Sequence, residues 1–259
     1  MTELSQSARS FRSLVEDESS FLRTCEGGDP GTPDKPSVWL LGIEPGWSLA
    51  DEAADQKGDA TYETQQEAYS VELQLTWPFN QQAFKLLSAL NGGRPEDYRE
   101  FALAARPFEQ GSNGYFKANL FPEPFNKVGT WDTATAQNTG FASKEEYRTW
   151  MRENRFRVLQ AWIHRCRPSL VIGCGLTHIS DFLAITGTSQ MPAARHVEVN
   201  GHSKRFHIST GGTVPIAVIP HLTGGSHSLN SNASIALVAE QIRSELSQAE
   251  KSSPPILAL

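Results

Sequence analysis

The amino-acid sequence predicts an α/β fold with a mainly parallel sheet. Four short apolar runs have the length and the flanking turn residues that are typical of buried strands. Helical patterns alternate with these runs, and that alternation favours parallel strands connected by helices that cover the sheet. The chain has 259 residues, of which 39% are hydrophobic, so it can bury one substantial core. We therefore expect one main domain.

The N-terminal part of the chain is expected to precede this domain as an extension. Residues 1–36 contain a helical pattern over Gln6–Arg23 and then a loop rich in Gly and Pro, which break regular structure. The first buried strand is predicted over Ser37–Ile43, at the start of the main domain, residues 37–248. Residues 48–76 are polar and lack a clean period, so we expect a long loop inserted after this strand.

Helices and strands continue to alternate over the rest of the chain. A helical pattern begins at Pro78 and stops at Asn91, where two glycines follow, a strong C-terminal signal. The second strand is predicted over Tyr115–Phe121, and Ser143 with Glu146 has the spacing of a capping box that begins the next helix. The later predicted elements are that helix to Arg165, a third strand (Leu170–Cys174), a helix to Ala184, a hairpin of Val197–Val199 and Phe206–Ile208 that turns at Asn200-Gly201, a fourth strand (Ile216–Ile219), a helix capped by Asn232 or Ser234 that runs to Leu246, and a flexible tail, 249–259.

Composition excludes several classes of protein. No apolar run approaches the roughly 20 residues that a membrane span needs, and the polar N-terminus is unlike a secretory signal. A soluble cytoplasmic protein is therefore expected. The three cysteines suffice neither for a disulfide framework nor for a four-cysteine metal site, and no metal site is predicted. Cys166 and Cys174 lie in apolar sequence and are expected in the core.

Charge is unevenly distributed along the chain. The net charge of −6 and the pI of 5.7 are unfavourable for binding nucleic acid, whose phosphates attract basic surfaces. Residues 144–167, however, carry seven Lys or Arg against three Glu, and Arg195–His207 is also locally basic. A surface that faces DNA and a solvated helix face explain residues 144–167 about equally well.

Polar residues suited to catalysis or binding follow three of the predicted strands. Glu44 comes just after the first strand, Asn119 within or just after the second, and His221 after the fourth. Because ligands bind beyond the carboxyl ends of parallel strands, we expect these three side chains to meet at one site. Their agreement in position is the main argument from the residues for a functional site.

Glu44 is the candidate for the chemistry. It lies on a tight turn, Gly42-Ile43-Glu44-Pro45-Gly46, where the glycines let the backbone approach a ligand and Pro45 stiffens the turn. A carboxylate there can orient a water, act as a general base or stabilise a developing cation. A solvated glutamate in an ordinary turn is the alternative interpretation.

Binding roles fall to the other candidates. The amide of Asn119 offers a donor and an acceptor to the edge of a pyrimidine, and a buried Asn that satisfies loop backbone is the alternative. Trp77 and Phe79 present aromatic faces, which stack on a flipped base in one interpretation and pack in the core in the other. His221, or His227 in its place, can stabilise an anionic leaving group, or simply lie in a surface turn.

The loop after the fourth strand is suited to contact phosphates. Its glycines and hydroxyl residues make a pliable segment whose amides can donate to phosphate oxygens. Leu222 can fill the gap that a displaced base leaves. The residues expected to contact DNA are Leu222, Thr223, Gly224, Gly225, Ser226 and His227.

The order of these motifs resembles the uracil-DNA glycosylase superfamily. GIEPG (residues 42–46) is similar to the GINPG motif of the mismatch-specific uracil/thymine branch, with Glu44 at the position of the water-activating Asn or Asp. QAFKLLSALNG, KANLFP, RPSLVIGCGLTH and IPHLTGG resemble the family's next helix, its base-reading strand, its third strand and its late histidine loop. The resemblance spans residues 37–245 in matching order.

This resemblance implies a three-layer α/β/α sandwich around a central, mainly parallel four-stranded sheet. It also implies an enzyme that flips a base out of DNA and hydrolyses its N-glycosidic bond. Glu44 would activate water, Asn119 would bind the base with the aromatic residues and the first turn, and His221 would stabilise the departing base. The chain departs from the family at Glu44, at Leu222, where the family has Pro, and at Thr223, where it has Ser.

The resulting expectation is a monofunctional DNA glycosylase whose partner is DNA. It would need no metal or redox cofactor and no obligatory protein partner, and the absence of a lysine from the motif positions argues against a Schiff-base lyase step. The altered first motif and the 48–76 loop leave room for a modified pyrimidine, in base-excision repair or in defence against phage with modified DNA. Two other classes stay open: a non-catalytic nucleic-acid or nucleotide sensor on the same fold, and an unrelated small-molecule α/β hydrolase.

Overall fold

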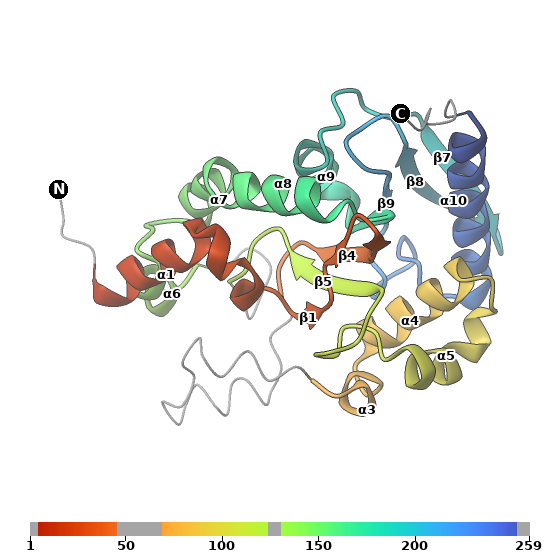
Figure 1. The fold of residues 1–259 in the computed structure, drawn as a ribbon, viewed down its shortest axis with the longest axis horizontal. Helices are drawn as coiled ribbons and strands as arrows, with labels where there is room; N and C mark the ends of the chain where they lie inside the picture. The colour runs from red at the N-terminus through yellow and green to blue at the C-terminus, as the bar shows by residue number, and fades with distance from the viewer. Residues whose placement is uncertain (1–4, 46–68, 124–130, 253–259) are drawn as a thin grey trace.

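A seven-stranded mixed sheet lies at the centre of the protein, with helices against both faces (Figure 1). It is seen in a computed structural model that describes residues 5–45, 69–123 and 131–252. The predicted α/β class is therefore confirmed, whereas the predicted four-stranded sheet is too small. The strands, in the spatial order β1-β5-β4-β6-β9-β8-β7, are β1 (Gly27–Gly28), β4 (Val38–Gly42), β5 (Tyr115–Asn119), β6 (Leu170–Cys174), β7 (Ala194–Val199), β8 (His202–Ser209) and β9 (Ile216–Ile219).

The four predicted strands form the parallel middle of this sheet, β5-β4-β6-β9. They are short, mostly buried runs, as expected of strands that helices cover on both faces. In register, Gly42 of β4 lies opposite Asn119 of β5, and Cys174 of β6 lies opposite Ile219 of β9. The carboxyl ends of all four strands therefore lie along one edge of the sheet.

Antiparallel strands at both sides of the parallel middle account for the larger sheet. The predicted hairpin is β7 with β8, and its turn residues Asn200 and Gly201 have φ values of 51° and 75°, as a type I′ turn requires. β8 pairs with β9, and β1 pairs with β5 at the opposite edge. A separate two-stranded sheet consists of β2 (Gly31–Thr32) and β3 (Lys35–Pro36).

The described N-terminal segment contributes to the core and is not merely an extension. The predicted first helix is α1 (Gln6–Glu16), followed by a 3₁₀ helix, η1 (Glu18–Thr24). Phe11 and Phe21 are buried in the same cluster as Trp39 of β4. Together with β1, this segment is therefore built into the main domain.

One face of the sheet is covered by α4, α5 and α10. Pro78 occupies the first turn of α4, as the sequence predicts. The backbone N–H of Ser234 donates to Ser231 Oγ (3.2 Å), so Ser231 caps the last helix and the predicted caps, Asn232 and Ser234, are wrong. The elements on this side are α3 (Val71–Gln74), α4 (Pro78–Leu90), η3 (Pro95–Asp97), α5 (Tyr98–Ala105) and α10 (Asn232–Ser252).

The other face is covered by α1, α7, α8 and α9 (Figure 1). Ser143 caps α7 by accepting from the backbone N–H of Glu146 (3.2 Å), as predicted. The predicted single helix to Arg165 is interrupted at Asn154, whose φ of −112° and ψ of −65° depart from helical values and whose side-chain Nδ2 donates to the carbonyl of Trp150 (2.8 Å). The elements are α6 (Thr133–Thr139), α7 (Lys144–Glu153), α8 (Arg155–Cys166), η4 (Leu176–His178) and α9 (Ile179–Ile185).

Three predicted features fall wholly or partly outside the described residues. Of the predicted loop 48–76, residues 48–68 lie outside them, and the remainder contains α3. Gly46 of the first turn also lies outside. Because α10 continues to Ser252, only residues 253–259 of the predicted tail lie outside, and the boundary set for that tail is too early.

Two of the three cysteines lie in the core. Cys166 and Cys174 are buried in the core, as predicted. Burial raises the pKa of the Cys174 thiol to about 12, so the reactive thiolate form is disfavoured at neutral pH. Within the described part of the chain, none of the helices combines the length and the apolarity that crossing a membrane requires.

Candidate functional site

The carboxyl ends of the parallel strands bring the candidate residues to one edge of the sheet. Pairing between β4 and β5 continues past their ends, where Phe121 N donates to Ile43 O (2.9 Å). Glu44 therefore lies beside the residues that follow Asn119. His221 follows β9, and at about 4.8 Å between neighbouring strands the backbones of β5 and β9 are roughly 14 Å apart. Side chains from the covering helices lie between them.

Glu44 is held by two cations from α7. Its Oε2 accepts a hydrogen bond from Lys144 Nζ (2.9 Å) and its Oε1 accepts one from Arg148 Nη2 (2.8 Å). The Glu44 side chain is only 10% exposed, so a solvated turn glutamate does not describe it. Capping by Ser143 fixes the first turn of α7, and the spacing of four residues places both cations on one side of that helix.

Ile43 and Pro45 complete the described part of the first turn. Ile43 packs against the core, and a Cβ added at Gly175 would lie 2.5 Å from its Cδ1. Pro45 is half-buried. The turn thus contacts the residue after β6 as well as the end of β5, which places it over the middle of the carboxyl edge.

A row of cations on α7 faces this edge. Lys144, Arg148 and Arg152 recur at four-residue steps and so share one side of the helix. Arg152 Nε pairs with Asp181 Oδ1 of α9 (2.8 Å). The guanidinium carbons of Arg148 and Arg152 lie 5.5 and 5.9 Å from the centre of the Phe121 ring. This part of the predicted basic segment therefore faces the candidate site and is not simply a solvated helix face.

A second carboxylate, which the sequence patterns do not single out, accompanies these cations. Asp181 accepts from Arg152 (2.8 and 3.0 Å) and is bonded to His178 Nδ1 (2.8 Å). Burial alone would raise the pKa of Asp181, but the hydrogen bonds from His178 and Arg152 outweigh it and lower the pKa from 3.8 to about 2. The one available sequence signal was a His three residues before an Asp at the start of a helix.

Asp181→Asn is expected to destabilise the protein by about 1–2 kcal/mol at neutral pH, after discounting for the exposure of Arg152. Because folding lowers the pKa of Asp181 from 3.8, its contribution is fully present above that pH and is lost as the pH falls towards 2. The difference in unfolding free energy between wild type and variant should therefore shrink over that window. Urea unfolding at neutral pH and across the window measures it, and a constant difference would contradict the ion-pair account.

Asn119 is the last residue of β5, and its side-chain amide is hydrogen-bonded within the protein. Its Nδ2 donates to Glu26 Oε1 (2.5 Å), and the residue is buried. Gly42 lies directly opposite on β4, and a Cβ at that position would lie 2.2 Å from Asn119 Oδ1. Glycine at position 42 is therefore required for Asn119 to fit, a packing role that stands beside its expected role in approaching a ligand.

Glu26 connects Asn119 to a buried lysine on the same strand. Lys117 lies two residues before Asn119, on the same face of the sheet, and its Nζ forms an ion pair with Glu26 Oε2. Lys117 Nζ also donates to Asn80 Oδ1 (2.9 Å), and Asn80 Nδ2 donates to Gln74 Oε1 (3.1 Å). The sequence analysis missed both Glu26 and Lys117. Lys117 could have been noticed, because a lysine two residues before an asparagine in a buried strand is unusual. The position of Glu26 depends on the pairing of β1 with β5, which no local pattern indicates.

Phe79 connects this cluster to His221. The centre of its half-buried ring lies 5.0 Å from Lys117 Nζ and 5.4 Å from the centre of the His221 imidazole. Trp77 instead packs edge-on against Tyr69, with ring centroids 4.8 Å apart. The structure therefore places Phe79 and His221 together beside Lys117, and Trp77 in a separate aromatic pair.

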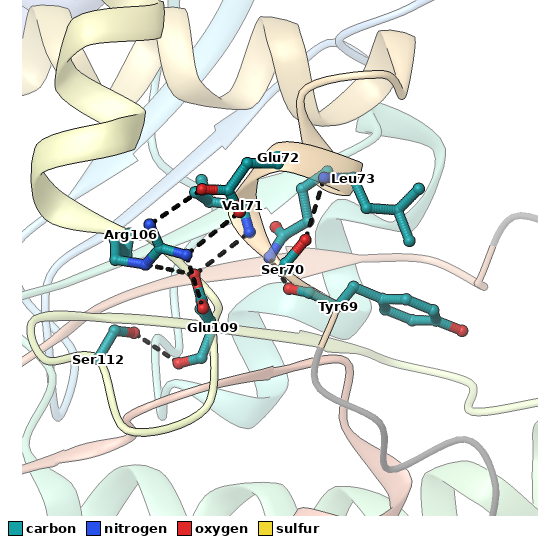
Figure 2. Close-up of polar contacts among 9 residues, drawn as sticks. Tyr69, Ser70, Val71, Glu72, Leu73, Arg106, Glu109 and Ser112 are labelled. Atoms are coloured by element: carbon teal, nitrogen blue, oxygen red, sulfur yellow. Dashed lines mark hydrogen bonds and ion pairs between the residues drawn. The ribbon is translucent and has the colours of Figure 1, made fainter.

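An ion-pair cluster fixes the chain just before α4 (Figure 2). Arg106 pairs through Nη1 with Glu72 Oε1 (3.1 Å) and through Nε with Glu109 Oε2 (2.8 Å). Glu109 also accepts from the backbone N–H of Val71 (3.2 Å), at the start of α3. These contacts hold the short helix that ends at Gln74, where the hydrogen-bond chain to Lys117 begins.

The loop after β9 is held from inside the fold. Lys204 of β8 is buried and donates to the backbone oxygens of Ser226 and Ser228, the latter at 3.0 Å. The N–H of Leu229 donates to the carbonyl of His221 (2.9 Å) and ties the two ends of the loop together. The position of His221 is thus set by a lysine that the sequence analysis noted only as part of a basic segment.

Leu222 is not placed as expected for contact with DNA. Its side chain is fully buried in the cluster that packs against α4 and α10. To enter a duplex it would have to leave the core, so the burial of Leu222 gives no support to the expected wedge role. The remaining loop residues do reach the surface: Thr223 is partly buried, and Gly224, Gly225, Ser226 and His227 are exposed.

A buried arginine supports the end of β5. Arg155 of α8 is fully buried and donates to the backbone oxygens of Asn119 (3.1 Å) and Leu120 (3.1 Å), and to Thr24 Oγ1 (2.6 Å). Burial lowers the pKa of this guanidinium. The strand end that carries Asn119 is thereby fixed from α8 and from η1.

The candidate residues form two neighbouring groups. The first, around Lys117, contains Asn119 and the ring pair of Phe79 with His221. Glu44 belongs to the second, with the cations of α7. The groups adjoin because the glycine that lies against Asn119 is only two residues before Glu44, about 7 Å along an extended chain. Within the described ranges, no group of three or more His, Cys, Asp or Glu side chains is arranged to hold a metal.

Comparisons with known proteins add no family assignment. The chain matches none of the protein-family models in a scan. A search of curated proteins likewise finds no significant match. The resemblance to uracil-DNA glycosylases therefore rests on the sequence motifs alone.

Proposed function

We propose that this protein is a DNA glycosylase that hydrolyses the N-glycosidic bond of a flipped-out pyrimidine base. The observation that carries the proposal is the position of Glu44, a carboxylate at the carboxyl edge of a parallel sheet, held by Lys144 and Arg148. Such a group suits a reaction in which water attacks while positive charge develops on a sugar. The order of the motifs along the chain supports the same assignment.

Glu44 is assigned to the attacking water. The two cations fix its orientation, and each carboxylate oxygen has a further lone pair that can accept a hydrogen bond from water. As the water oxygen bonds to C1′ of the sugar, one water proton passes to Glu44 and the C1′–N bond breaks. The base leaves with the bonding electron pair and takes up a proton from solvent, Glu44 releases its proton to solvent, and an abasic site remains in the DNA. The carboxylate charge also stabilises the cationic sugar.

The group around Lys117 is assigned to the base. The half-buried ring of Phe79 offers a face on which a flipped base can stack. His221 is exposed and next to that ring, so its imidazole can stabilise the negative charge of the departing base. The ammonium of Lys117, beside the same ring, adds positive charge at the same place.

The cations of α7 are assigned to the DNA backbone. Arg148 and Arg152 are partly exposed and lie at the site, so they supply a local attraction for phosphate that the acidic net charge of the chain conceals. The exposed loop residues that follow His221 offer further backbone amides to phosphate oxygens. DNA binding by these groups should weaken as salt concentration rises.

The direct test is base release from defined DNA. The protein is incubated with oligonucleotides that carry uracil, a thymine mismatch or a modified cytosine, and abasic sites are then revealed by alkaline cleavage. We expect alkali-dependent cleavage at the altered base in at least one substrate, with no strand break before alkali. Salt-sensitive binding without abasic sites would instead identify a non-catalytic sensor. Neither binding nor abasic sites would favour a small-molecule hydrolase.

A further inference from the structure

The amide that should read the base is not available to a ligand. Asn119 is 2% exposed, and its Nδ2 is used in the hydrogen bond to Glu26. Its Oδ1 is packed against Gly42, where even a methyl group would not fit. A pyrimidine brought to this edge of the sheet therefore does not meet a free amide, and it meets the groups that cover Asn119.

Of the residues that cover Asn119, Glu26 is the more accessible to a ligand. Its side chain is 27% exposed, compared with 8% for Lys117. A carboxylate has about four lone-pair positions, so Glu26 can accept further hydrogen bonds beyond those from Asn119 and Lys117. Among the described residues, Lys117 donates to Glu26 and Asn80, which accounts for two of the three N–H groups of an ammonium. The Glu26 carboxylate therefore offers a ligand a hydrogen-bond acceptor, and the adjacent Lys117 ammonium offers it a donor.

The backbone fixes this pair next to the stacking ring. The N–H of Glu26 donates to the carbonyl of Lys117 (3.0 Å), where the chain enters β1. Lys117 Nζ in turn lies 5.0 Å from the centre of the Phe79 ring. Lys117 Nζ, and the Glu26 carboxylate paired with it, therefore lie close to the ring on which the base is proposed to stack.

We propose that Glu26 makes the site selective for a pyrimidine with an amino group at C4, a cytosine-type base, over the 4-keto bases uracil and thymine. The inference rests on the proposed glycosylase function. A carboxylate accepts hydrogen bonds and donates none, and in base recognition it pairs with the N4 amino group of cytosine. The adjacent N3 of cytosine is an acceptor, which Lys117 can satisfy. In uracil the C4 oxygen would face the carboxylate oxygen, with no proton between them.

Matched substrates measure the selectivity for an amino over a keto group at C4 of the pyrimidine. Single-stranded oligonucleotides carry cytosine or uracil, or 5-hydroxymethylcytosine or 5-hydroxymethyluracil, so that each pair differs only in the C4 substituent and the accompanying proton at N3, and base pairing does not contribute. The kcat/KM for abasic-site formation is measured for each. We expect the amino member of at least one pair to be preferred by roughly tenfold or more, the discrimination typical of one good base contact. A preference for the keto member in both pairs would overturn the inference and leave the glycosylase function standing. No release from any substrate would overturn both.

Variants of Glu26 show whether this residue causes the preference for amino over keto bases. Glu26→Gln gives the side chain a donor for a keto oxygen, so the amino-to-keto ratio should fall by about tenfold or more. Glu245→Gln is the matched control, because Glu245 is also 27% exposed and paired with an arginine, Arg195 (2.6 Å), outside the candidate site. That control should leave the ratio unchanged. Equal loss on both members of each pair in Glu26→Gln would show a structural role and contradict the proposal.

Discussion

Replacing Glu44 by glutamine is expected to slow base release by roughly a hundredfold to ten-thousandfold, the range for losing a general base. Glutamine keeps the size of the side chain but cannot take the water proton, and it removes the negative charge that stabilises the cationic sugar. The loss should appear in the rate constant of base release measured under single-turnover conditions. DNA binding should change less, because the stacking ring and the cations of α7 are still present to bind DNA. Full activity in this variant would contradict the mechanism.

Stability must be measured beside activity in this experiment. Glu44→Gln weakens the ion pairs with Lys144 and Arg148, both of which are partly buried, and so lowers the unfolding free energy as well. Rates are therefore compared well below the thermal midpoint of the variant. Glu145→Gln is the control, since Glu145 lies in the same turn of α7 and is exposed. It should change neither the rate of base release nor the binding of DNA.

Arg155→Met is expected to lower the unfolding free energy by about 3 kcal/mol, a value at the upper end for single substitutions. Methionine fills a similar volume but leaves the buried carbonyls of Asn119 and Leu120, and the half-buried hydroxyl of Thr24, without the hydrogen bonds that Arg155 donates. Each unsatisfied buried group costs about 1–3 kcal/mol, and removal of a buried charge offsets part of that cost.

The matched control is Arg157→Met on the same helix. Arg157 is exposed, so its loss should change the unfolding free energy by about 0.5 kcal/mol or less. Urea unfolding compares both variants with the wild type. Similar midpoints for the two variants would show that the buried guanidinium contributes nothing beyond helix propensity, against the present account.

Patterns within short segments predicted the parallel middle of the sheet and the edge at which the candidate residues lie. The run predicted over Ser37–Ile43 contains β4, one residue shorter at each end, and the run predicted over Leu170–Cys174 coincides with β6, because a strand buried on both faces is marked by its own residues. Burial of Leu222 was not predicted, since one leucine in a loop of glycines and hydroxyls has no period from which its direction can be inferred.

Contacts between distant segments lay outside what such patterns can predict. Glu26 and Asn119 are 93 residues apart, and their hydrogen bond exists only because β1 pairs with β5. The pairing of Glu44 with Lys144 likewise depends on how α7 packs over the sheet, although the charge of each residue was evident. The interruption at Asn154 was not predicted, because the segment contains no Pro or Gly that would indicate a helix end.

The two-residue strand β1 also protects the protein from aggregation. It covers the outer hydrogen-bonding edge of β5, whose run Tyr115–Phe121 is mostly apolar, and an uncovered edge of that kind recruits strands from other molecules. At the opposite edge of the sheet, β7 carries Arg195 and Glu198, charges that discourage such pairing. A fragment that begins at residue 37, where sequence alone would place the domain boundary, would therefore expose the unpaired edge of β5. A fragment expressed without aggregation has to retain Gly27 and Gly28.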